Sequence, residues 1–432
     1  MKIPVNYSQR YLLNNEVHAR QYEALWAPER LSYLVLLPGD EGEQANLKAI
    51  SELCVRHNAP PPAPDANHYS ADFGTFRVRW EKHTEFVRYT FMVHEPFDDP
   101  FAHPALERVP RDWLAALPGQ IIVAAHAAIQ TARASVPEVA EIAKRYFEGN
   151  TLIGATISGG AARAYTDLRI HADGFSRFLV CDISLGSRQA GRIMQRLLEI
   201  DTYRMMALTG LPIARDLIAR LAEAENQLVD VNNAMCQTKE EDEPKLLSRI
   251  IRLATEVENG IAATQYRFDA SIAYFELMNR RIEELREERI QGLQTYREFM
   301  DRRLVPAMNT CESAARRQMA ISERISQTSQ LLSTRVDLTR EFQNQQLLAS
   351  MNRRTKLQLR LQQAVEGLSV AAITYYTVGL IGYLAKAGKT AGLDIQPDLV
   401  TGFSIPIVAL VIAFGIHHLK EKATKGDEES AE

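Results

Sequence analysis

The sequence predicts an α+β (or α/β) N-terminal cytosolic domain, a long antiparallel helical stalk or coiled coil, and a C-terminal two-helix transmembrane hairpin. Three observations predict this fold class. The first part of the chain alternates short apolar runs with turns, and the second loses strand signals and becomes rich in Arg, Glu, Gln, Leu and Ala. The last part contains two charge-free apolar stretches. A length of 432 residues agrees with two or three domains.

Residues 1–185 form the predicted mixed α/β domain. Asp173-Gly174 is a strong signal for a two-residue hairpin turn, and Gly159-Gly160 predicts a second turn. Residues 76–80 alternate apolar and basic side chains, so we expect a strand with one exposed face. The predicted strands are 31–37, 76–80, 86–93, 120–125, 152–158, 164–171 and 175–182, and the predicted helices are 44–56 and 136–147.

Residues 186–366 form the predicted stalk or coiled-coil domain. Breaks at 210–212, Pro244 and Pro306 divide it into helices, because proline in a helix interior costs about 3 kcal/mol. The segment RIEELREERI (281–290) predicts a solvated, charge-rich helix. The predicted helices are 187–209, 213–238, 245–305 and 307–366.

The last of these helices has no internal proline and leads directly into the first apolar stretch. A helix of this length needs a partner for its apolar face. The best series of residues spaced three and four apart along this helix, which we call its stripe, is half polar. This predicts that the helix packs loosely against its partner or keeps one face in contact with water. The stripe is Ile321, Ile325, Thr328, Leu332, Arg335, Thr339, Phe342, Gln346, Ala349 and Arg353.

Two apolar stretches predict the transmembrane hairpin. Residues 367–385 and 399–419 are each long enough to cross a hydrocarbon core of about 30 Å, with 386–398 as a short external loop. Basic residues precede the first span and follow the second in the charged tail 420–432, so both termini and the bulk of the chain are expected in the cytosol. The N-terminus lacks the apolar run of a secretory signal.

Composition and motifs exclude several function classes. A net charge of −4 without a basic domain argues against nucleic-acid binding. The four cysteines are far apart, which argues against a disulfide framework or a structural zinc site. Because the sequence contains no GxSxG, HExxH or GxGxxG motif, we predict no cofactor, no metal and no assigned catalytic residue.

Polar clusters in the first domain are candidate ligand or interaction sites. In one, Glu16 and His18 alternate onto one strand face and could share a proton, although a capped turn explains the same residues. In another, His83 with Glu81 or Glu85 could bind a metal, or the segment could be a charged hairpin connection. The first cluster is Asn14, Asn15, Glu16, His18 and Arg20.

A further cluster occupies alternate positions of the predicted strand 164–171. Such an alignment could form a polar ligand-binding wall, or a solvated face of an antiparallel sheet. Its members are Tyr165, Asp167, Arg169 and His171.

The first predicted span is unusually rich in hydroxyl groups. These could line a pore or hydrogen-bond between helices, while the absence of charge in either span argues against a proton relay. The residues are Thr374, Tyr375, Tyr376, Thr377 and Tyr383.

Several segments resemble a bacterial family described only as uncharacterised membrane-anchored proteins. They are LNNEVHAR (13–20), RWEKHTEF (79–86), YTDLRIHADGFSR (165–177), QRLLEIDTYRMMALTGLPIAR (195–215) and VEGLSVAAITYYTVGLIGYLAKA (365–387). Where the family pattern has proline after HAR, this chain has Gln21-Tyr22. The resemblance covers nearly the whole chain and implies a bacterial inner-membrane location, but it brings no activity or catalytic residue.

The domain order is also similar to that of CorA-type magnesium transporters, which are oligomeric channels. However, their Gly-Met-Asn signature after the first span is missing, and Lys386 and Lys389 near the outer loop would repel Mg²⁺. The likeness concerns layout, and layout alone does not establish function.

The favoured expectation is a non-enzymatic, membrane-anchored sensor or scaffold with a cytosolic α/β domain. A homo-oligomeric, CorA-like channel or transporter component is the alternative, and a membrane-tethered enzyme using Glu16 and His18 is the third hypothesis. The expected partners are the lipid bilayer, further copies of the chain through the stalk helices, and an unknown protein or small molecule. No nucleic-acid partner is expected.

Overall fold

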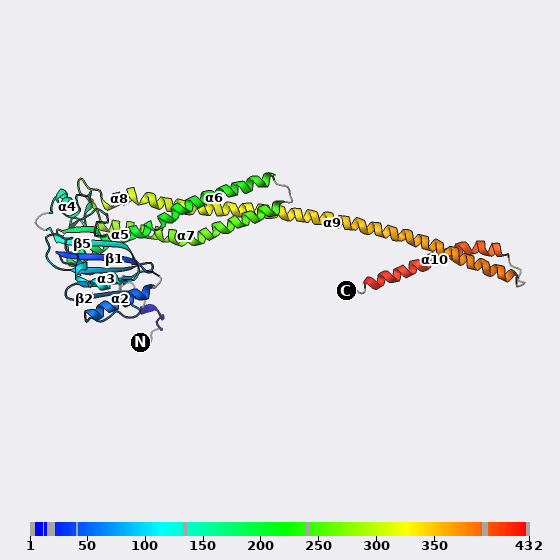
Figure 1. The fold of residues 1–432 in the computed structure, drawn as a ribbon, viewed down its shortest axis with the longest axis horizontal. Coiled ribbons are helices and arrows are strands. Elements are labelled where there is room, and N and C mark those ends of the chain that lie inside the picture. Colours follow the sequence, from blue (N-terminus) through cyan, green and yellow to red (C-terminus); the bar gives the residue numbers. More distant parts are fainter. Residues whose placement is uncertain are drawn as a thin grey trace. The chain divides into compact units, whose positions relative to one another are not determined.

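The computed structural model describes residues 5–11, 13–14, 22–39, 42–132, 136–237, 242–390 and 396–428. An N-terminal α/β sheet, a set of long helices and an apolar C-terminal helix are present, as the sequence predicts (Figure 1). The chain divides into two compact units. The first comprises Met1–Thr238 and Lys245–Gln330, and the second comprises Lys239–Pro244 and Leu331–Glu432.

A mixed sheet forms the centre of the first unit, with the strand order β2-β3-β4-β1-β5-β8-β7-β6-β9 among the described residues. The paired strands are antiparallel except β5 and β8, which are parallel. The strands are β1 (Glu29–Leu37), β2 (His68–Asp72), β3 (Arg77–Lys82), β4 (Val87–Val93), β5 (Gln120–Thr131), β6 (Ile153–Ile157), β7 (Ala162–Thr166), β8 (Ser176–Asp182) and β9 (Glu288–Arg289).

The helices are α2 (Gly42–Arg56), α3 (Arg111–Ala115), α4 (Val139–Tyr146), α5 (Ser187–Leu208), α6 (Gly210–Gln237), α7 (Glu243–Leu285), α8 (Tyr296–Arg303), α9 (Val305–Thr390) and α10 (Pro397–Glu428), with a 3-10 turn, η1, at Ala105–Arg108. Helices cover both faces of the sheet. On one face, α2 and α3 bury Leu53 and Trp113 against strand residues such as Trp80. On the other, α5 buries Leu197 against Tyr33, joined by residues of α7, α8 and the start of α9.

Because of this second layer of helices, the prediction that residues 76–80 form a strand with one exposed face is wrong. The alternation of apolar and basic residues suggested that β3 exposes its basic face, but Arg79 is 7% exposed and Glu81 is 1% exposed. Helix α5 covers that face, and the charges are buried in a network rather than solvated. A half-exposed strand and a strand with a buried polar face carry the same sequence pattern.

Three helices of the first unit pack side by side: α6, α7 and the first part of α9 (Figure 1). The first members of the predicted α9 stripe are buried here, with Ile321 and Ile325 each 1% exposed. Gly210 begins α6 at a crowded point, because a Cβ at this position would lie 2.7 Å from Ser271 Oγ.

The prediction of one helix over 245–305 is wrong. Helix α7 ends at Leu285, and Arg286 adopts a left-handed backbone conformation with φ 52°. The chain then adds β9 beside β6 before α8 begins at Tyr296. Sheet pairing overrides the helical propensity of RIEELREERI. Likewise, the predicted strand 164–171 ends at Thr166.

The second unit contains the later part of α9 and all of α10. The predicted helix 307–366 and the predicted span 367–385 are parts of one element, α9. Both helices contain an apolar stretch long enough to cross a membrane, with mean hydropathies of 1.5 and 2.4. The two helices touch where a Cβ on Gly382 would lie 3.1 Å from Thr401 Oγ1.

Candidate functional site

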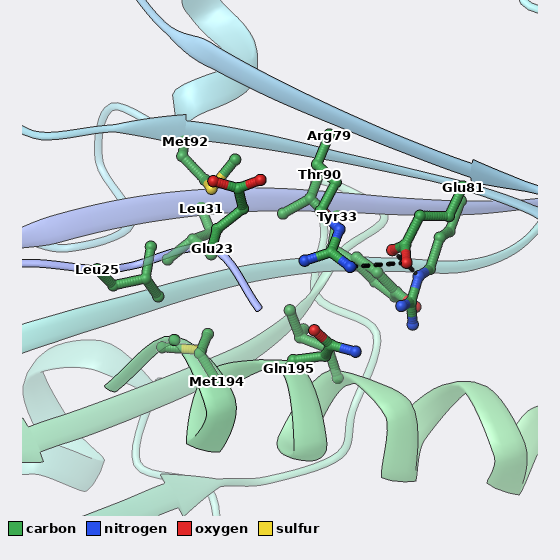
Figure 2. A pocket seen from close by; sticks show the side chains of 13 residues that line it. Glu23, Leu25, Leu31, Tyr33, Arg79, Glu81, Thr90, Met92, Met194 and Gln195 are labelled. Atoms are coloured by element: carbon green, nitrogen blue, oxygen red, sulfur yellow. Dashed lines mark hydrogen bonds and ion pairs between the residues drawn. The ribbon is translucent and has the colours of Figure 1, made fainter. Parts of the chain in front are cut away.

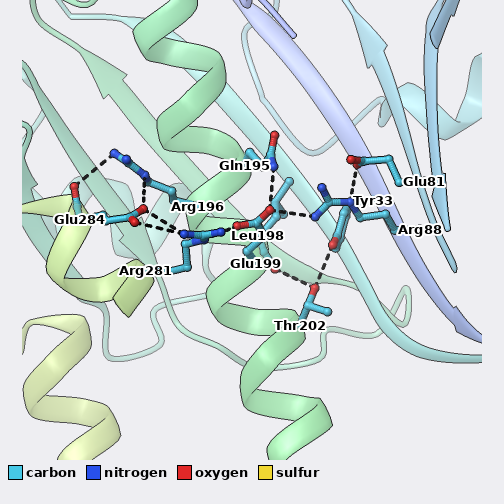
Figure 3. A network of polar contacts seen from close by, with 10 residues as sticks. All are labelled: Tyr33, Glu81, Arg88, Gln195, Arg196, Leu198, Glu199, Thr202, Arg281 and Glu284. Atoms are coloured by element: carbon cyan, nitrogen blue, oxygen red, sulfur yellow. Dashed lines mark hydrogen bonds and ion pairs between the residues drawn. The ribbon is translucent and has the colours of Figure 1, made fainter. Parts of the chain in front are cut away.

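A buried network of charges links the sheet to α5 and α7 (Figure 3). Strand register creates its first part, because Glu81 of β3 lies directly opposite Arg88 of β4. Glu81 accepts hydrogen bonds from Arg88 Nε and, at 2.8 Å, from Arg79 Nη2. Glu81 therefore lies between two guanidinium groups that come from the same face of the sheet.

Glu199 of α5 connects this sheet cluster to the helices. It accepts a hydrogen bond from Arg88 Nη1 at 3.0 Å and another from Arg281 Nε of α7. Gln195, one helical turn before Glu199, donates to the same carboxylate at 2.7 Å. Ion pairs then join Arg281 to Glu284 at 3.1 Å and Glu284 to Arg196 at 2.9 Å. The result is an alternating chain of cations and anions across four elements: β3, β4, α5 and α7.

Pairing keeps these groups ionised despite their burial. Burial by itself would raise the pKa of the Glu81 carboxyl, but the charges and hydrogen bonds of Arg88 and Arg79 lower it to about 2. For Glu199, burial is likewise outweighed by Arg88 and Arg281, which lower its pKa. Carboxylates with lowered pKa values are weak bases, so the network is suited to holding elements together rather than to moving protons.

Tyr33 of β1 lies at the end of the network that is nearest the sheet (Figure 3). Burial raises the pKa of Tyr33, so the phenol is neutral at physiological pH. Its hydroxyl lies 2.9 Å from Thr202 Oγ1, which itself donates to the Leu198 carbonyl oxygen. Tyr33 is therefore the donor in this contact and is not free to act as a nucleophile.

A small cavity of about 30 Å³ lies beside Arg79 and Gln195, between the sheet and α5 (Figure 2). One water needs roughly 10–15 Å³ of such space, whereas ligand pockets measure roughly 300–1,000 Å³. The cavity therefore has room for water but not for a cofactor. Its apolar lining comes from Leu25, Leu31, Met92, Met194 and Leu198.

Gly191 of α5 lies beside this cavity, where the segment before β1 passes close to the helix. A Cβ at Gly191 would lie 1.7 Å from the Glu23 carbonyl oxygen, so only glycine admits the backbone of the segment that precedes β1. That segment is fixed further by the hydrogen bond from Leu25 N to Ser187 O at 3.1 Å.

An ion pair outside this network connects α7 to the β3–β4 hairpin. Arg267 donates two hydrogen bonds of 2.9 Å to the two carboxylate oxygens of Glu85. Burial acts to raise the pKa of Glu85, but the hydrogen bonds of Arg267 and Tyr274 lower it. Arg281 follows Arg267 by close to four helical turns, so both arginines project from the same face of α7.

The His83 and Glu85 cluster thus takes the form of a charged hairpin connection. Glu85 is engaged by Arg267, and the His83 ring stacks on Phe86 with a centroid distance of 4.4 Å. Among the described residues there is no group of three or more His, Cys, Asp or Glu side chains that could hold a metal ion.

The cluster at 165–171 does not lie along one strand face, because β7 ends at Thr166. Tyr165 is buried in an apolar cluster with Leu179 and Cys181, and Arg169 is exposed. His171 does meet Asp167: its Nε2 lies 3.0 Å from Asp167 Oδ2, and its Nδ1 lies 3.0 Å from Glu148 Oε1. Each ring nitrogen therefore faces a carboxylate oxygen, one from Asp167 and one from Glu148.

The remaining predicted residues lie at two ends of the chain. Asn14 is exposed, while Asn15, Glu16, His18 and Arg20 lie outside the described residues. In α9, Thr374 is 9% exposed and donates to the Val370 carbonyl oxygen, and Thr377 is half-buried. Three tyrosines of α9 are exposed, at 72–77%: Tyr375, Tyr376 and Tyr383.

A larger groove of about 980 Å³ runs between α6 and α7. Its floor includes Leu217, Leu221 and Val257, and its rim carries Glu223 and Glu256. This surface combines an open apolar floor with a charged edge.

Sequence reasoning named neither the network nor the groove. A single charge within an apolar run was the available signal, as in Arg88 within FVRYTFMV and Glu199 within RLLEID. Charged residues are almost never fully buried unless paired, so such positions predict a partner on another element.

Comparisons with known proteins give a family but no activity. A family model described as "Protein of unknown function (DUF3422)" matches residues 5–423. Searches of the curated proteins and of the solved structures found no match.

Proposed function

Because this chain belongs to the DUF3422 family of proteins of unknown function, we propose its role from its own residues: a non-enzymatic sensor or scaffold anchored in the bacterial inner membrane. In this proposal α9 and α10 cross the membrane as a hairpin. Both termini and the sheet domain are cytosolic, and the groove between α6 and α7 receives a protein or small-molecule partner.

One observation carries this proposal. Helix α9 is a single element whose first residues pack in the sheet domain and whose last residues form an apolar stretch of mean hydropathy 1.5. Met308 of α9 is 2% exposed in the core cluster beneath the sheet. A helix shared by a folded domain and a candidate span supports an anchor that also reports on the domain.

The chemistry of the charge network supports a non-enzymatic role. Its carboxylates are ion-paired with lowered pKa values, and Tyr33 is neutral and hydrogen-bonded. The adjoining cavity of about 30 Å³ is too small for a substrate of ordinary size.

Self-association through α9 is part of the proposal. Every residue from 340 to 365 is exposed, although an apolar series recurs there with heptad spacing. Arg354 and Gln358 occupy the two remaining positions of that series, as polar residues that select register do in coiled coils. The apolar members are Leu347, Met351, Leu361, Val365 and Leu368.

Membrane topology tests the anchor. Cys236 is exposed on α6, and Lys389→Cys would add a thiol at the far end of α9. In intact spheroplasts, an impermeant maleimide should label Lys389→Cys and leave Cys236 unlabelled until the cells are lysed. Recovery of the chain in the soluble fraction, or labelling of Cys236 in intact cells, would refute the proposal.

Oligomeric mass in detergent tests self-association. Leu347→Ser with Leu361→Ser should reduce the assembly, because both side chains belong to the apolar series. The matched control is Leu338→Ser with Leu359→Ser, which removes two leucines from outside the series that are also more than half exposed. A monomeric wild-type chain would exclude both self-association and a CorA-like channel.

Ion flux in proteoliposomes separates the scaffold from the channel. The scaffold should give no flux above that of empty vesicles. Flux that disappears in Thr374→Val with Thr377→Val would favour a CorA-like pore instead, and turnover of a substrate would favour an enzyme.

A further inference from the structure

A face of three cations precedes the apolar stretch of α9. Arg353, Lys356 and Arg360 are spaced three and four residues apart, so they share one face of the helix. All three are exposed, and no ion pair joins them to another described residue. The sequence contains no Asp or Glu between Glu341 and Glu366. This face, which we call the basic face, therefore carries three uncompensated charges.

The basic face and the apolar series of α9 lie on different sides of the helix. At 3.5 residues per turn, the positions of Leu347 and Leu361 are roughly 100–150° away from those of Lys356 and Arg360. Pairing of two α9 helices through the apolar series would thus leave the basic face open. A merely solvated face would more often mix both signs of charge.

Distance along the helix brings this face near the lipid phosphates. With a rise of 1.5 Å per residue, Arg360 lies about 10 Å, Lys356 about 16 Å and Arg353 about 21 Å before Gly367, the first residue of the predicted span. The headgroup layer is roughly 5–8 Å thick on each side of the hydrocarbon. Long Arg and Lys side chains extend toward it, and the surface potential acts over about 8 Å more.

The sequence is also basic after the second apolar stretch. Gly382, near the end of α9, lies close to Thr401, near the start of α10, as expected where two helices of a hairpin meet at its loop. The sequence after Ile416 contains Lys420, Lys422 and Lys425. In the proposed hairpin, the basic residues before the first span and after the second belong to the same, cytosolic side of the membrane.

We propose that the basic face of α9 binds the phosphates of anionic phospholipids in the cytoplasmic leaflet. The inference rests on the proposed membrane anchoring and names the lipid class that the anchor selects. Phosphate oxygens accept hydrogen bonds from guanidinium and ammonium groups, and each cation near an anionic surface is worth about a fivefold preference.

The test uses the full-length protein in vesicles that contain phosphatidylcholine and phosphatidylglycerol. Lipid that remains bound after extraction into mild detergent is counted by mass spectrometry and compared with the bulk ratio. We expect several-fold enrichment of phosphatidylglycerol, which should vanish in Arg353→Gln/Lys356→Gln/Arg360→Gln and weaken at ~1 M salt. The matched control, Arg249→Gln/Arg252→Gln/Arg302→Gln, removes three exposed cations of α7 and α8 and should keep the enrichment.

The outcomes separate the two proposals. A chain that does not float with the vesicles would refute the anchoring. A chain that floats but retains both lipids at the bulk ratio, or whose triple variant keeps the enrichment, would refute the basic face as a lipid site. Binding of an acidic protein by the basic face, without lipid enrichment, would also overturn the inference.

Discussion

Replacing Glu199 by Gln is the most direct test of the buried charge network. Glu199 has a side chain 5% exposed and receives hydrogen bonds from Arg88, Arg281 and Gln195. A glutamine keeps the shape but removes the negative charge, which leaves Arg88 buried with Glu81 as its remaining anion. Removal of one partner from a buried ion pair costs about 3–5 kcal/mol, since the other charge stays desolvated.

Native-state hydrogen exchange measures this cost locally in the full-length protein. A loss of about 3–5 kcal/mol should speed exchange of the protected β3, β4 and α5 amides by at least about a hundredfold. Glu284→Gln is the matched control, because its side chain is 32% exposed and such pairs contribute about 0–1 kcal/mol. Equal effects of the two variants, or a change below about fivefold for Glu199→Gln, would refute the idea that the network holds α5 to the sheet.

Three further predictions follow from the first unit. Gly191→Ala should destabilise this unit by at least about 1–3 kcal/mol in chemical denaturation, because the new Cβ would overlap the Glu23 carbonyl. The control Gly260→Ala should cost less, because its Cβ would meet only the movable end of the Gln318 side chain. Burial lowers the pKa of His126 from 6.5 to about 4, so the unfolded state takes up a proton first, and this group should reduce stability by about 2–4 kcal/mol as the pH drops from about 6.5 to 4. His126→Gln should remove most of the slope between about pH 6.5 and 5, where the carboxylates stay ionised, and an unchanged slope there would contradict the assignment. Arg267→Glu should weaken protection of the β3–β4 hairpin in hydrogen exchange and Glu85→Arg should restore it in the double variant, whereas additive losses would count against the pair.

The sequence predicted much of the fold because local patterns decide local structure. The run 31–37 became β1, and the helix expected at 187–209 became α5. The predictions failed where the local conformation depends on contacts with elements that are distant in the sequence. Nothing local in RIEELREERI indicates that Glu288 and Arg289 pair with β6, and nothing near Thr166 indicates that β7 ends there.

The candidate site was harder to predict for the same reason. Arg79 lay in the predicted strand 76–80 and Glu81 directly after it, but the burial of both depends on α5, more than a hundred residues later. The 165–171 cluster was expected on one strand face, and only Asp167 and His171 meet there, through a turn rather than a strand. The alternation of residue types indicates which side chains share one side of a strand. Which residues they contact depends on the tertiary structure.

The path of the chain through the first unit has a consequence for synthesis. The core cluster on one face of the sheet, whose helical cover begins with α5, is complete only once α8 and Met308 of α9 have been synthesised. The predicted span begins at Gly367, 59 residues after Met308. At roughly 5–20 residues per second, this interval lasts about 3–12 s. The sheet domain can therefore close before the first apolar stretch is made, and a fragment ending at residue 185 would leave that face uncovered.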